Sequence, residues 1–213
     1  MEKMVNSKAY GFFDWVFRLI VINLLTLLLS FFVVTILPAI VACMKTLKEY
    51  ASGETEQVYK VYFRNFKLYS EKSFFIWLIL LVIIAISFIS INFYVGLDTS
   101  NLFSSAGFYM MLFMVILIIL ILLHLPLIII YFPSFTIIET VRASILLGGK
   151  YIITTILLLI ILVLGVMILP VLPISVLIGI SLPSFMAYKL TNPIYTYLQQ
   201  IKFEEKYHED RGE

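Results

Sequence analysis

The sequence predicts an all-α protein: a polytopic membrane helix bundle of about five transmembrane helices joined by short interfacial helices. Hydrophobic residues make up 62% of the 213 residues and charged residues 13%, and the mean hydropathy is +1.06. A soluble domain is typically about half apolar and a quarter charged. Several apolar runs also reach the roughly 20 residues that a helix needs to cross the hydrocarbon core. We therefore interpret residues 1–213 as a single integral membrane domain.

The first three apolar runs each predict one span. The first, residues 15–43, is longer than a span requires, so we expect a helix that is tilted or bent at Pro38. The second, residues 74–94, contains no charged residue. The third, residues 108–132, includes His124.

The last apolar stretch, residues 152–190, is too long for one span, since a continuous helix there would measure roughly 57 Å. Pro170 and Pro173 lie near its centre. Proline removes a backbone donor and disfavours helix in the residue before it. We therefore expect a tight hairpin with arms over residues 152–169 and 171–189.

The joints between these runs predict two interfacial helices, over residues 56–72 and 134–147. In the first, aromatic and basic residues recur at helical spacing, which is typical of a helix with rings in the acyl boundary and cations toward anionic headgroups. The candidate lipid-interface residues are Tyr59, Lys60, Tyr62, Phe63, Arg64, Phe66, Lys67 and Tyr69. Ser52-Gly53 indicates a helix end and turn, and Ser134 is the expected cap of the second interfacial helix.

The basic residues predict an orientation. Of 15 Lys and Arg residues, six lie between the first and second spans, two between the third and fourth, and four near the C-terminus. With five spans these twelve share one side, so the positive-inside rule places the charged tail, residues 203–213, in the cytoplasm and the N-terminus outside. With four spans the basic tail would lie outside, against the same rule.

Four polar side chains inside apolar runs are candidate functional positions: Asn23, Thr26, Ser30 and His124. The first three share one helix face and either line a polar path or form hydrogen-bonded helix packing. His124 lies two residues before Pro126, which frees a backbone carbonyl. It is either a functional ionisable group or a neutral imidazole bonded to that carbonyl or to a neighbouring hydroxyl.

No other pattern indicates chemistry. The chain lacks a P-loop, a H-E-x-x-H motif and a Ser–His–Asp arrangement, and it has no carboxylate in the second to fifth spans. We expect no catalytic residue, no cofactor and no metal site. Cys43 is the only cysteine, which excludes an intramolecular disulfide, and we expect it to pack inside a helix.

The N-terminal region carries motifs of a known family. Asn23 is followed by Leu27-Leu28-Leu29-Ser30, Val34-Thr35-Ile36-Leu37-Pro38-Ala39 and Ala42, then by Gly53-Glu54 and Phe63-Arg64-Asn65-Phe66-Lys67. From about Asn23 to Glu71 this series resembles the signature of the YesL-like family of small bacterial integral membrane proteins, which contain a domain of unknown function. The pattern departs from the family at Phe32-Val33, where Leu-Pro is common, and at Leu37, where Gly usually precedes the proline.

The resemblance implies a bacterial cytoplasmic membrane protein without an assigned function, often associated with carbohydrate uptake. We therefore expect a non-catalytic accessory or regulatory component of a membrane transport system. The alternative is a small-solute transporter or channel that acts as an oligomer. The expected partners are a bilayer with anionic headgroups and a membrane transporter complex, and nucleic acid is not expected.

Overall fold

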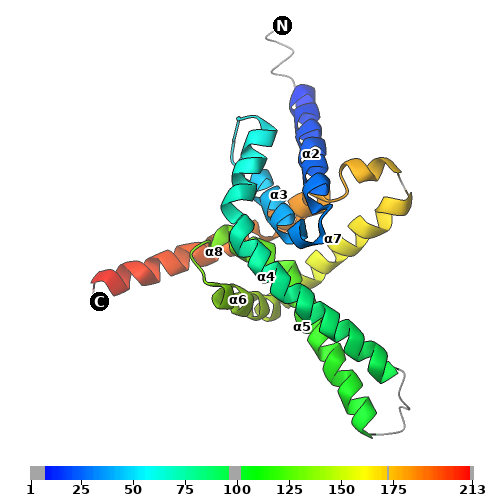
Figure 1. Cartoon of the computed structure of the whole chain (residues 1–213). Coiled ribbons are helices and arrows are strands. Elements are labelled where there is room, and N and C mark those ends of the chain that lie inside the picture. Colours follow the sequence, from blue (N-terminus) through cyan, green and yellow to red (C-terminus); the bar gives the residue numbers. More distant parts are fainter. Residues whose placement is uncertain (1–7, 96–101, 172, 212–213) are drawn as a thin grey trace.

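The computed structural model describes residues 8–95, 102–171 and 173–211, and all regular structure within these ranges is helical (Figure 1). The prediction of an all-α chain is confirmed. The elements are, in order, α2 (Lys8–Ser30), η1 (Val33–Thr35), α3 (Ile36–Ala51), α4 (Val58–Val95), α5 (Leu102–Tyr131), α6 (Ile137–Lys150), α7 (Ile152–Val171), η2 (Pro173–Leu177) and α8 (Ser181–Arg211).

The first apolar run forms a helical hairpin instead of one span. The Arg18 guanidinium lies 4.3 Å from the centroid of the Tyr50 ring and donates to the Glu54 carbonyl. Closer to the break, Ile22 packs in the same cluster as Cys43. α2 and α3 are therefore antiparallel. The prediction of a single helix over residues 15–43 is wrong, and this run does not carry the N-terminus to the side opposite residues 45–54.

The position of the break follows from local chemistry. The Thr35 hydroxyl lies within hydrogen-bonding reach of the carbonyls of Phe32 and Leu29, so its one proton satisfies a carbonyl at the end of α2. Pro38 falls in the first turn of α3, where its missing N–H has no intrahelical partner to lose. The proline therefore begins a new helix, whereas we expected it to bend an existing one.

α4 merges two elements that we expected to be separate. It is continuous for 38 residues and contains most of the predicted interfacial helix, residues 56–72, together with the whole predicted span, residues 74–94. No Gly or Pro occurs between Val58 and Val95, so nothing in the sequence ends the helix. The predicted turn before it is confirmed, because Gly53 has a φ of +100°, a conformation that favours glycine.

The α5–α6 segment largely follows the sequence prediction. α5 matches the expected span over residues 108–132, and a separate short helix follows it. Its cap is Thr136 and not Ser134. Thr136 forms a capping box with Glu139, in which the hydroxyl accepts from the Glu139 N–H and the carboxylate accepts from the Thr136 N–H.

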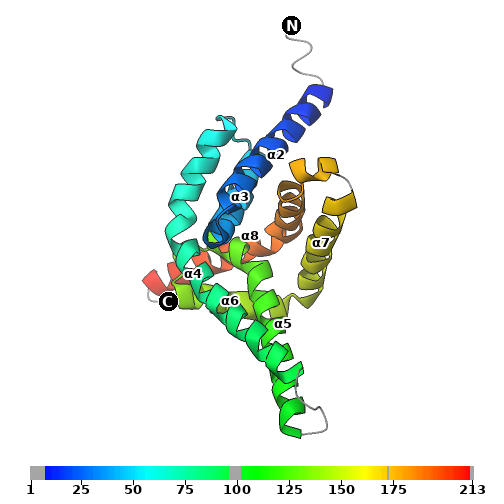
Figure 2. The ribbon, with the colours of Figure 1, turned by 45° about the vertical axis from the view of Figure 1, so that its right-hand side comes forward.

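α7 and α8 form the expected hairpin, although its second arm differs from residues 171–189. A 3-10 helix follows α7, and α8 begins only at Ser181. A Cβ atom at Gly165 would lie 2.8 Å from Pro183 Cγ, so the two arms pack closely. The charged tail, residues 203–213, continues α8 as far as Arg211, and the C-terminal half of α8 extends away from the other helices (Figures 1 and 2).

Within the described residues, the number of candidate spans is lower than the predicted five. In that part of the chain, three helices are long and apolar enough to cross a membrane: Gly11–Ser30, Val58–Val95 and Ser104–Tyr131. A fourth is possible if α6 and α7, which meet at a bend of 101°, count as one broken span. These apolar helices identify a membrane protein.

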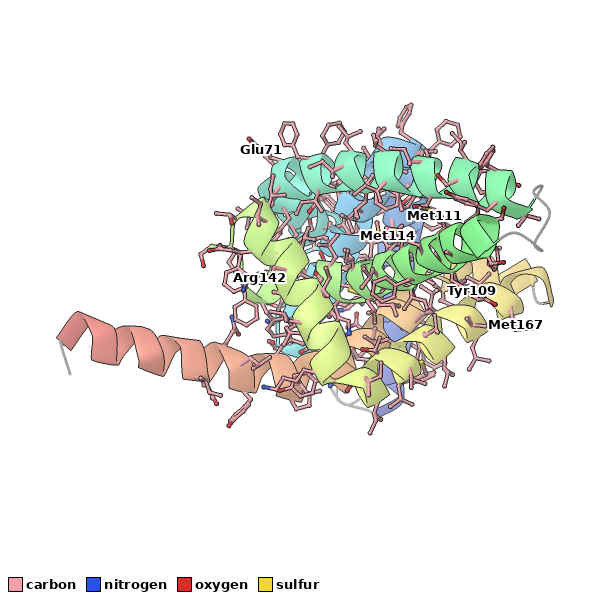
Figure 3. The ribbon with its side chains drawn as sticks, turned by 90° about the horizontal axis from the view of Figure 1, so that it is seen from below. Glu71, Tyr109, Met111, Met114, Arg142 and Met167 are labelled. Atoms are coloured by element: carbon pink, nitrogen blue, oxygen red, sulfur yellow. The ribbon has the colours of Figure 1, made fainter. Side chains whose placement is uncertain are left out.

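Large apolar side chains cover the outer surface of α4, α5 and α7. Phe75, Tyr109 and Met167 are each more than half exposed. Figure 3 shows Tyr109 and Met167 toward one end of the molecule and the charged Glu71 and Arg142 toward the other. Exposed apolar surface on this scale suits contact with lipid.

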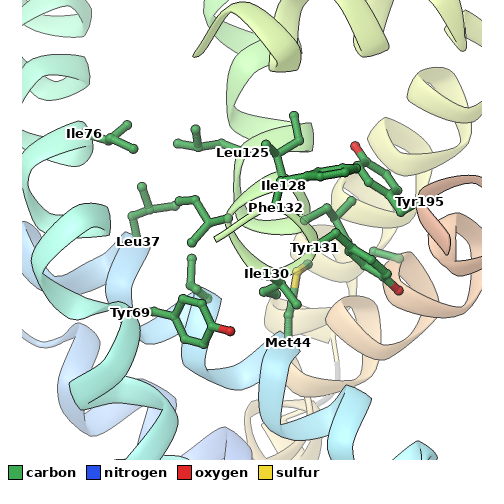
Figure 4. Close-up of a cluster of buried hydrophobic side chains, with 14 of the residues drawn as sticks. Leu37, Met44, Tyr69, Ile76, Leu125, Ile128, Ile130, Tyr131, Phe132 and Tyr195 are labelled. Carbon is green, nitrogen blue, oxygen red and sulfur yellow. The ribbon is translucent and has the colours of Figure 1, made fainter. Parts of the chain in front are cut away.

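The core lies where α3, α4, α5 and α8 meet (Figure 4). Leu37 of α3, Ile76 of α4, Leu125 and Ile128 of α5 and Tyr195 of α8 are all nearly inaccessible to solvent. This cluster surrounds the C-terminal half of α5, which is the most completely buried part of that helix. Polar groups within it must find partners inside the protein.

Candidate functional site: buried polar ties between helices

His124 connects three helices. Its Nδ1 lies 2.7 Å from the Tyr195 hydroxyl of α8, and its Nε2 lies 2.9 Å from the Thr155 hydroxyl of α7. Thr155 Oγ1 is also 2.9 Å from the Gly148 carbonyl at the end of α6. All of these side chains are buried, with His124 1% exposed. The network ties α5, α7 and α8 together where the α7–α8 hairpin opens.

The hydrogen bonds assign the His124 tautomer. Thr155 has one hydroxyl proton, and the Gly148 carbonyl can only accept, so Thr155 donates to it. Thr155 must then accept from His124 Nε2–H, which leaves Nδ1 as the acceptor for the Tyr195 hydroxyl. This acceptor role requires a neutral imidazole, which burial without a carboxylate partner among the described residues favours, and both nitrogens are then used. This arrangement matches the expected bond to neighbouring hydroxyls, whereas the carbonyl freed by Pro126 is not the partner.

The network continues outward through Tyr131. The Tyr131 and Tyr195 rings stack with centroids 5.2 Å apart. The Tyr131 hydroxyl donates to Asn192 Oδ1 over 2.6 Å, and Gln199 donates to the Tyr131 carbonyl. The Lys48 ammonium of α3 lies 3.4 Å from the centroid of the Tyr131 ring. Tyr131 thus joins the buried histidine to a more exposed cation.

Asn23 forms a second tie. Its Nδ2 donates to the Val176 carbonyl over 2.7 Å, and its Oδ1 accepts from the Ile180 and Ser181 N–H groups over 2.8 and 3.1 Å. These two N–H groups lie at the start of α8, where a helix has no backbone acceptors of its own. Asn23, which is 0% exposed, therefore caps α8 from the middle of α2.

Thr26 and Ser30, the other two polar candidates on α2, differ in their partners. The Thr26 hydroxyl donates to the Ile22 carbonyl of its own helix, and it lies against the buried Cys43 thiol together with Ser184. Burial of Cys43 agrees with its expected packing role. The Ser30 hydroxyl is buried with no partner among the described residues.

The structure therefore gives separate partners to the candidate polar residues of the two apolar runs. Asn23 faces the tip of the α7–α8 hairpin, Thr26 faces Cys43, and His124 belongs to the distinct network around Tyr195 and Thr155. None of these three side chains lines a shared polar surface. Within the described residues they act as ties between helices.

The predicted lipid-interface residues divide into exposed and buried groups. Tyr59, Lys60, Phe63 and Lys67 are exposed, as expected. Tyr62 is fully buried and donates to the Ala39 carbonyl, so its predicted lipid contact is wrong.

The remaining members of that set also turn toward the protein. Tyr69 is 8% exposed within the core, and Phe66 is partly buried against the α2–α3 hairpin. Helical spacing placed every ring at the surface of one segment, but the α2–α3 hairpin covers one face of that segment.

Arg64 is exposed, but its guanidinium already forms ion pairs with acidic side chains. Its guanidinium lies 2.8 Å from Glu56, 3.1 Å from Glu49 and 3.5 Å from Glu54. Backbone N–H groups of Glu56 and Thr55 donate to Glu54 and hold the pKa of its carboxyl below the usual value. The cluster fixes the α3–α4 turn, so Arg64 is not available to a lipid headgroup in the way we predicted.

The buried hydrogen bonds of Asn23 and His124 hold helices together. In the described part of the chain, no group of three or more His, Cys, Asp or Glu side chains is placed to bind a metal ion. The acceptor nitrogen of His124 is filled by a hydroxyl from its own chain, so it is not free to take a proton from a substrate.

Sequence reasoning missed Tyr195, Thr155, Tyr131 and Lys48. Tyr195 and Thr155 are ordinary residues in helical segments, and only the packing of α7 and α8 against α5 gives them a role. Lys48 was counted only as one of many basic residues. Its position against Tyr131 depends on the hairpin turn at residues 31–35, which the sequence did not reveal.

Comparison with known proteins gives one family match. Residues 19–91 match the model of the family described as "Protein of unknown function, DUF624". The matched segment contains Asn23 and the second half of α2, all of α3 and most of α4. The search of curated proteins found no match, and neither did the search of solved structures. Over residues 19–91 the chain is thus similar to the DUF624 family, which confirms its predicted resemblance to the YesL-like proteins.

Proposed function

We propose that this chain is a non-catalytic protein of the bacterial cytoplasmic membrane that acts as an accessory or regulatory component of a membrane transport system. The resemblance to YesL-like proteins makes carbohydrate transporters the first partners to test. The proposal rests chiefly on one observation: Asn23 and His124, the two strongest candidates for a substrate path, have all their hydrogen-bonding atoms engaged inside the fold.

Transport by the chain itself would require polar groups that can exchange protein partners for a solute. Breaking the Asn23 bonds would leave two N–H groups at the start of α8 without acceptors in apolar surroundings. Each unsatisfied group costs about 1–3 kcal/mol. Breaking the hydrogen bonds around His124 would likewise leave buried donors without acceptors. A role that keeps the bundle intact is therefore favoured over an alternating path.

The outer part of α4 supports a docking role. Tyr59 and Phe63 are exposed aromatic residues, and Lys60 and Lys67 are exposed cations on the same helix. Aromatic and charged groups at a helix surface suit both the membrane interface and a protein partner. This surface is the best candidate for contact with a transporter subunit on the cytoplasmic side.

We also propose that the C-terminus is cytoplasmic. No Lys or Arg occurs between Ser73 and Val141. Contacts of Lys72 with the Phe135 carbonyl and of Gln199 with the Tyr131 carbonyl bring the basic regions of α4 and α8 to the same end of the α4–α5 hairpin. This clustering, together with the positive-inside rule, supports the orientation without depending on a count of five spans.

Copurification from native membranes tests the accessory role. A tagged chain, solubilised in a mild detergent, should enrich subunits of a membrane transporter over a tagged helical membrane protein of similar size. A Lys60→Glu/Lys67→Glu variant should lose that enrichment and retain its elution profile. Recovery of the chain alone, combined with solute uptake by liposomes that contain only the purified protein, would favour the transporter alternative.

Reporter fusions test the orientation. A reporter that is active only outside the cell should be inactive when fused after residue 213 and active when inserted in the α4–α5 connection, residues 96–101. Activity at the C-terminal fusion would contradict the proposed orientation and leave the accessory role to the copurification test.

A further inference from the structure

Lys48 differs from the neighbouring basic residues because it lacks an anionic partner. Arg18 pairs with Asp14, and Arg64 pairs with three glutamates. No carboxylate among the described residues makes a salt bridge with Lys48. Among the same residues, its ammonium makes a cation–π contact with the Tyr131 ring. Lys48 is nevertheless partly buried.

Glu49, whose charge favours the protonated form of Lys48, is already engaged by other partners. Glu49 Oε1 lies 3.3 Å from Lys45, and Glu49 Oε2 lies 3.1 Å from Arg64 and 2.9 Å from the Asn65 amide. Both carboxylate oxygens are therefore engaged. Burial, with a smaller contribution from the like charge of Lys45, lowers the pKa of Lys48 to about 8, and a still smaller opposing effect of Glu49 does not offset it. The fold thus holds a cation at a position where its charge is poorly compensated.

A second donor lies beside this cation. Asn192 Oδ1 accepts from the Tyr131 hydroxyl over 2.6 Å and from Thr196 over 3.4 Å. Its amide nitrogen has no acceptor in the described part of the chain. Lys48 contacts the ring of Tyr131 and Asn192 contacts its hydroxyl, so one side chain joins the two donors.

We propose that Lys48 and Asn192 hold the phosphate of an anionic phospholipid headgroup at the junction of α3, α5 and α8. An ammonium has three donors, and a tyrosine ring engages its charge from one side only. The remaining donors, with the Asn192 amide, provide charge-assisted hydrogen bonds to phosphate oxygens. A bound anion would also compensate the charge that the fold leaves unpaired.

The surroundings favour a lipid as the source of this phosphate. The site lies at the end of the α4–α5 hairpin where Lys72 meets the Phe135 carbonyl, beyond the apolar outer surfaces of the two helices. Tyrosine side chains are common at this level of a membrane protein, where an apolar ring meets a polar surface. A soluble phosphate ester offers the same oxygens without acyl chains. The inference does not depend on the accessory role.

Lipid titration of the full chain in detergent tests the site. Bound phosphatidylglycerol is counted by native mass spectrometry and by the rise in thermal stability, at about 0.5 M NaCl, where the screening length is only about 4 Å. We expect phosphatidylglycerol to bind more tightly than phosphatidylcholine. Lys48→Met should weaken phosphatidylglycerol binding about tenfold or more, and Lys48→Arg should retain most of it.

Lys150→Met is the matched control. Lys150 is exposed, and its ammonium lies 5.6 Å from the centroid of the Tyr151 ring. The substitution therefore removes an equal charge near an aromatic residue with which the ammonium makes no close contact. We expect its effect to stay below about twofold, because general attraction to anionic lipid is screened. Equal effects of the Lys48 and Lys150 variants, or equal binding of the two lipids, would overturn the proposal.

A competition arm separates the two sources of phosphate. Glycerol 3-phosphate or inorganic phosphate should not displace phosphatidylglycerol at equal concentration if the acyl chains contribute to binding. Displacement by these solutes, sensitive to Lys48→Met, would support the phosphate site and assign it to a soluble ester instead. Circular dichroism and gel filtration of each variant establish that a loss of binding is not a loss of fold.

Discussion

Asn23 and Lys48 are both polar groups that the fold places among apolar helices, yet they are satisfied in opposite ways. Asn23 is completely buried and makes three hydrogen bonds to the backbone at the α7–α8 tip. Lys48 is only partly buried and faces one aromatic ring. The comparison shows that the chain supplies partners to Asn23, which holds helices together, whereas Lys48, which lacks such partners, lies at the edge of the core.

Loss of the Asn23 tie should produce the largest effect. Asn23→Leu removes all three bonds and leaves the Ile180 and Ser181 N–H groups without acceptors, so we expect the free energy of unfolding to fall by about 2–4 kcal/mol. Denaturant titration in detergent measures this change. Leu24→Ala, at a neighbouring exposed position, is the control and should cost less. A fall no larger than that of the control would show that Asn23 does not hold the hairpin.

The His124 network should contribute less, because Thr155 keeps its bond to the Gly148 carbonyl when the imidazole is removed. We expect His124→Ala to lower the free energy of unfolding by about 1–3 kcal/mol, from lost hydrogen bonds and from the cavity, and to affect function less than stability. A double-mutant cycle with Tyr195→Phe should show coupling. Lost function at unchanged thermal stability would instead make His124 a functional residue.

Lys48→Met should change the free energy of unfolding in the opposite direction. Without anionic lipid, removal of an unpaired, partly desolvated charge should raise the free energy of unfolding by about 1 kcal/mol near pH 7. The folded-state pKa, about 8, lies below the ordinary 10.5, so the folded chain binds fewer protons than the unfolded chain between these values. The wild type should therefore gain stability as the pH rises from about 8 toward 10.5, with the full penalty present below pH 8.

The Lys48→Met variant tests this pH dependence, because it should lack the gain in stability between about pH 8 and pH 10.5. Thermal unfolding of the two proteins in detergent, recorded at matched pH values, measures the difference. An identical pH dependence in wild type and Lys48→Met would show that another group is responsible. Destabilisation by the substitution would show that the contact with Tyr131 outweighs the cost of burial.

Arg64→Met should have the smallest effect, although Arg64 contacts three carboxylates. The guanidinium is half exposed, and exposed ion pairs contribute about 0–1 kcal/mol. We expect a loss below about 1 kcal/mol that diminishes further when salt is added. A larger loss that persists in high salt would mean that the cluster organises the α3–α4 turn more strongly than its exposure indicates.

Local signals in the sequence were reliable where one residue type decides the conformation. Ser52-Gly53 correctly marked the end of α3, since the backbone there has a positive φ. Continuous apolar runs correctly predicted α5 and α7. Proline was an uneven guide, because Pro170 and Pro173 correctly predicted the α7–α8 hairpin, whereas Pro38 lies in the first turn of α3 and does not bend a continuous helix. A proline in a first turn and one that bends a helix look alike in sequence.

The sequence by itself determined that the chain is helical, that it is built for lipid and which polar residues lie inside apolar segments, because composition and hydropathy report solvent preference directly. Only the tertiary structure decided that residues 15–43 fold back on themselves, that Tyr62 and Tyr69 turn inward, and that His124 meets Tyr195. These outcomes depend on contacts between residues as many as 158 positions apart, such as Asn23 with Ser181. No local pattern specifies such contacts, because the partners become neighbours only when the hairpins pack.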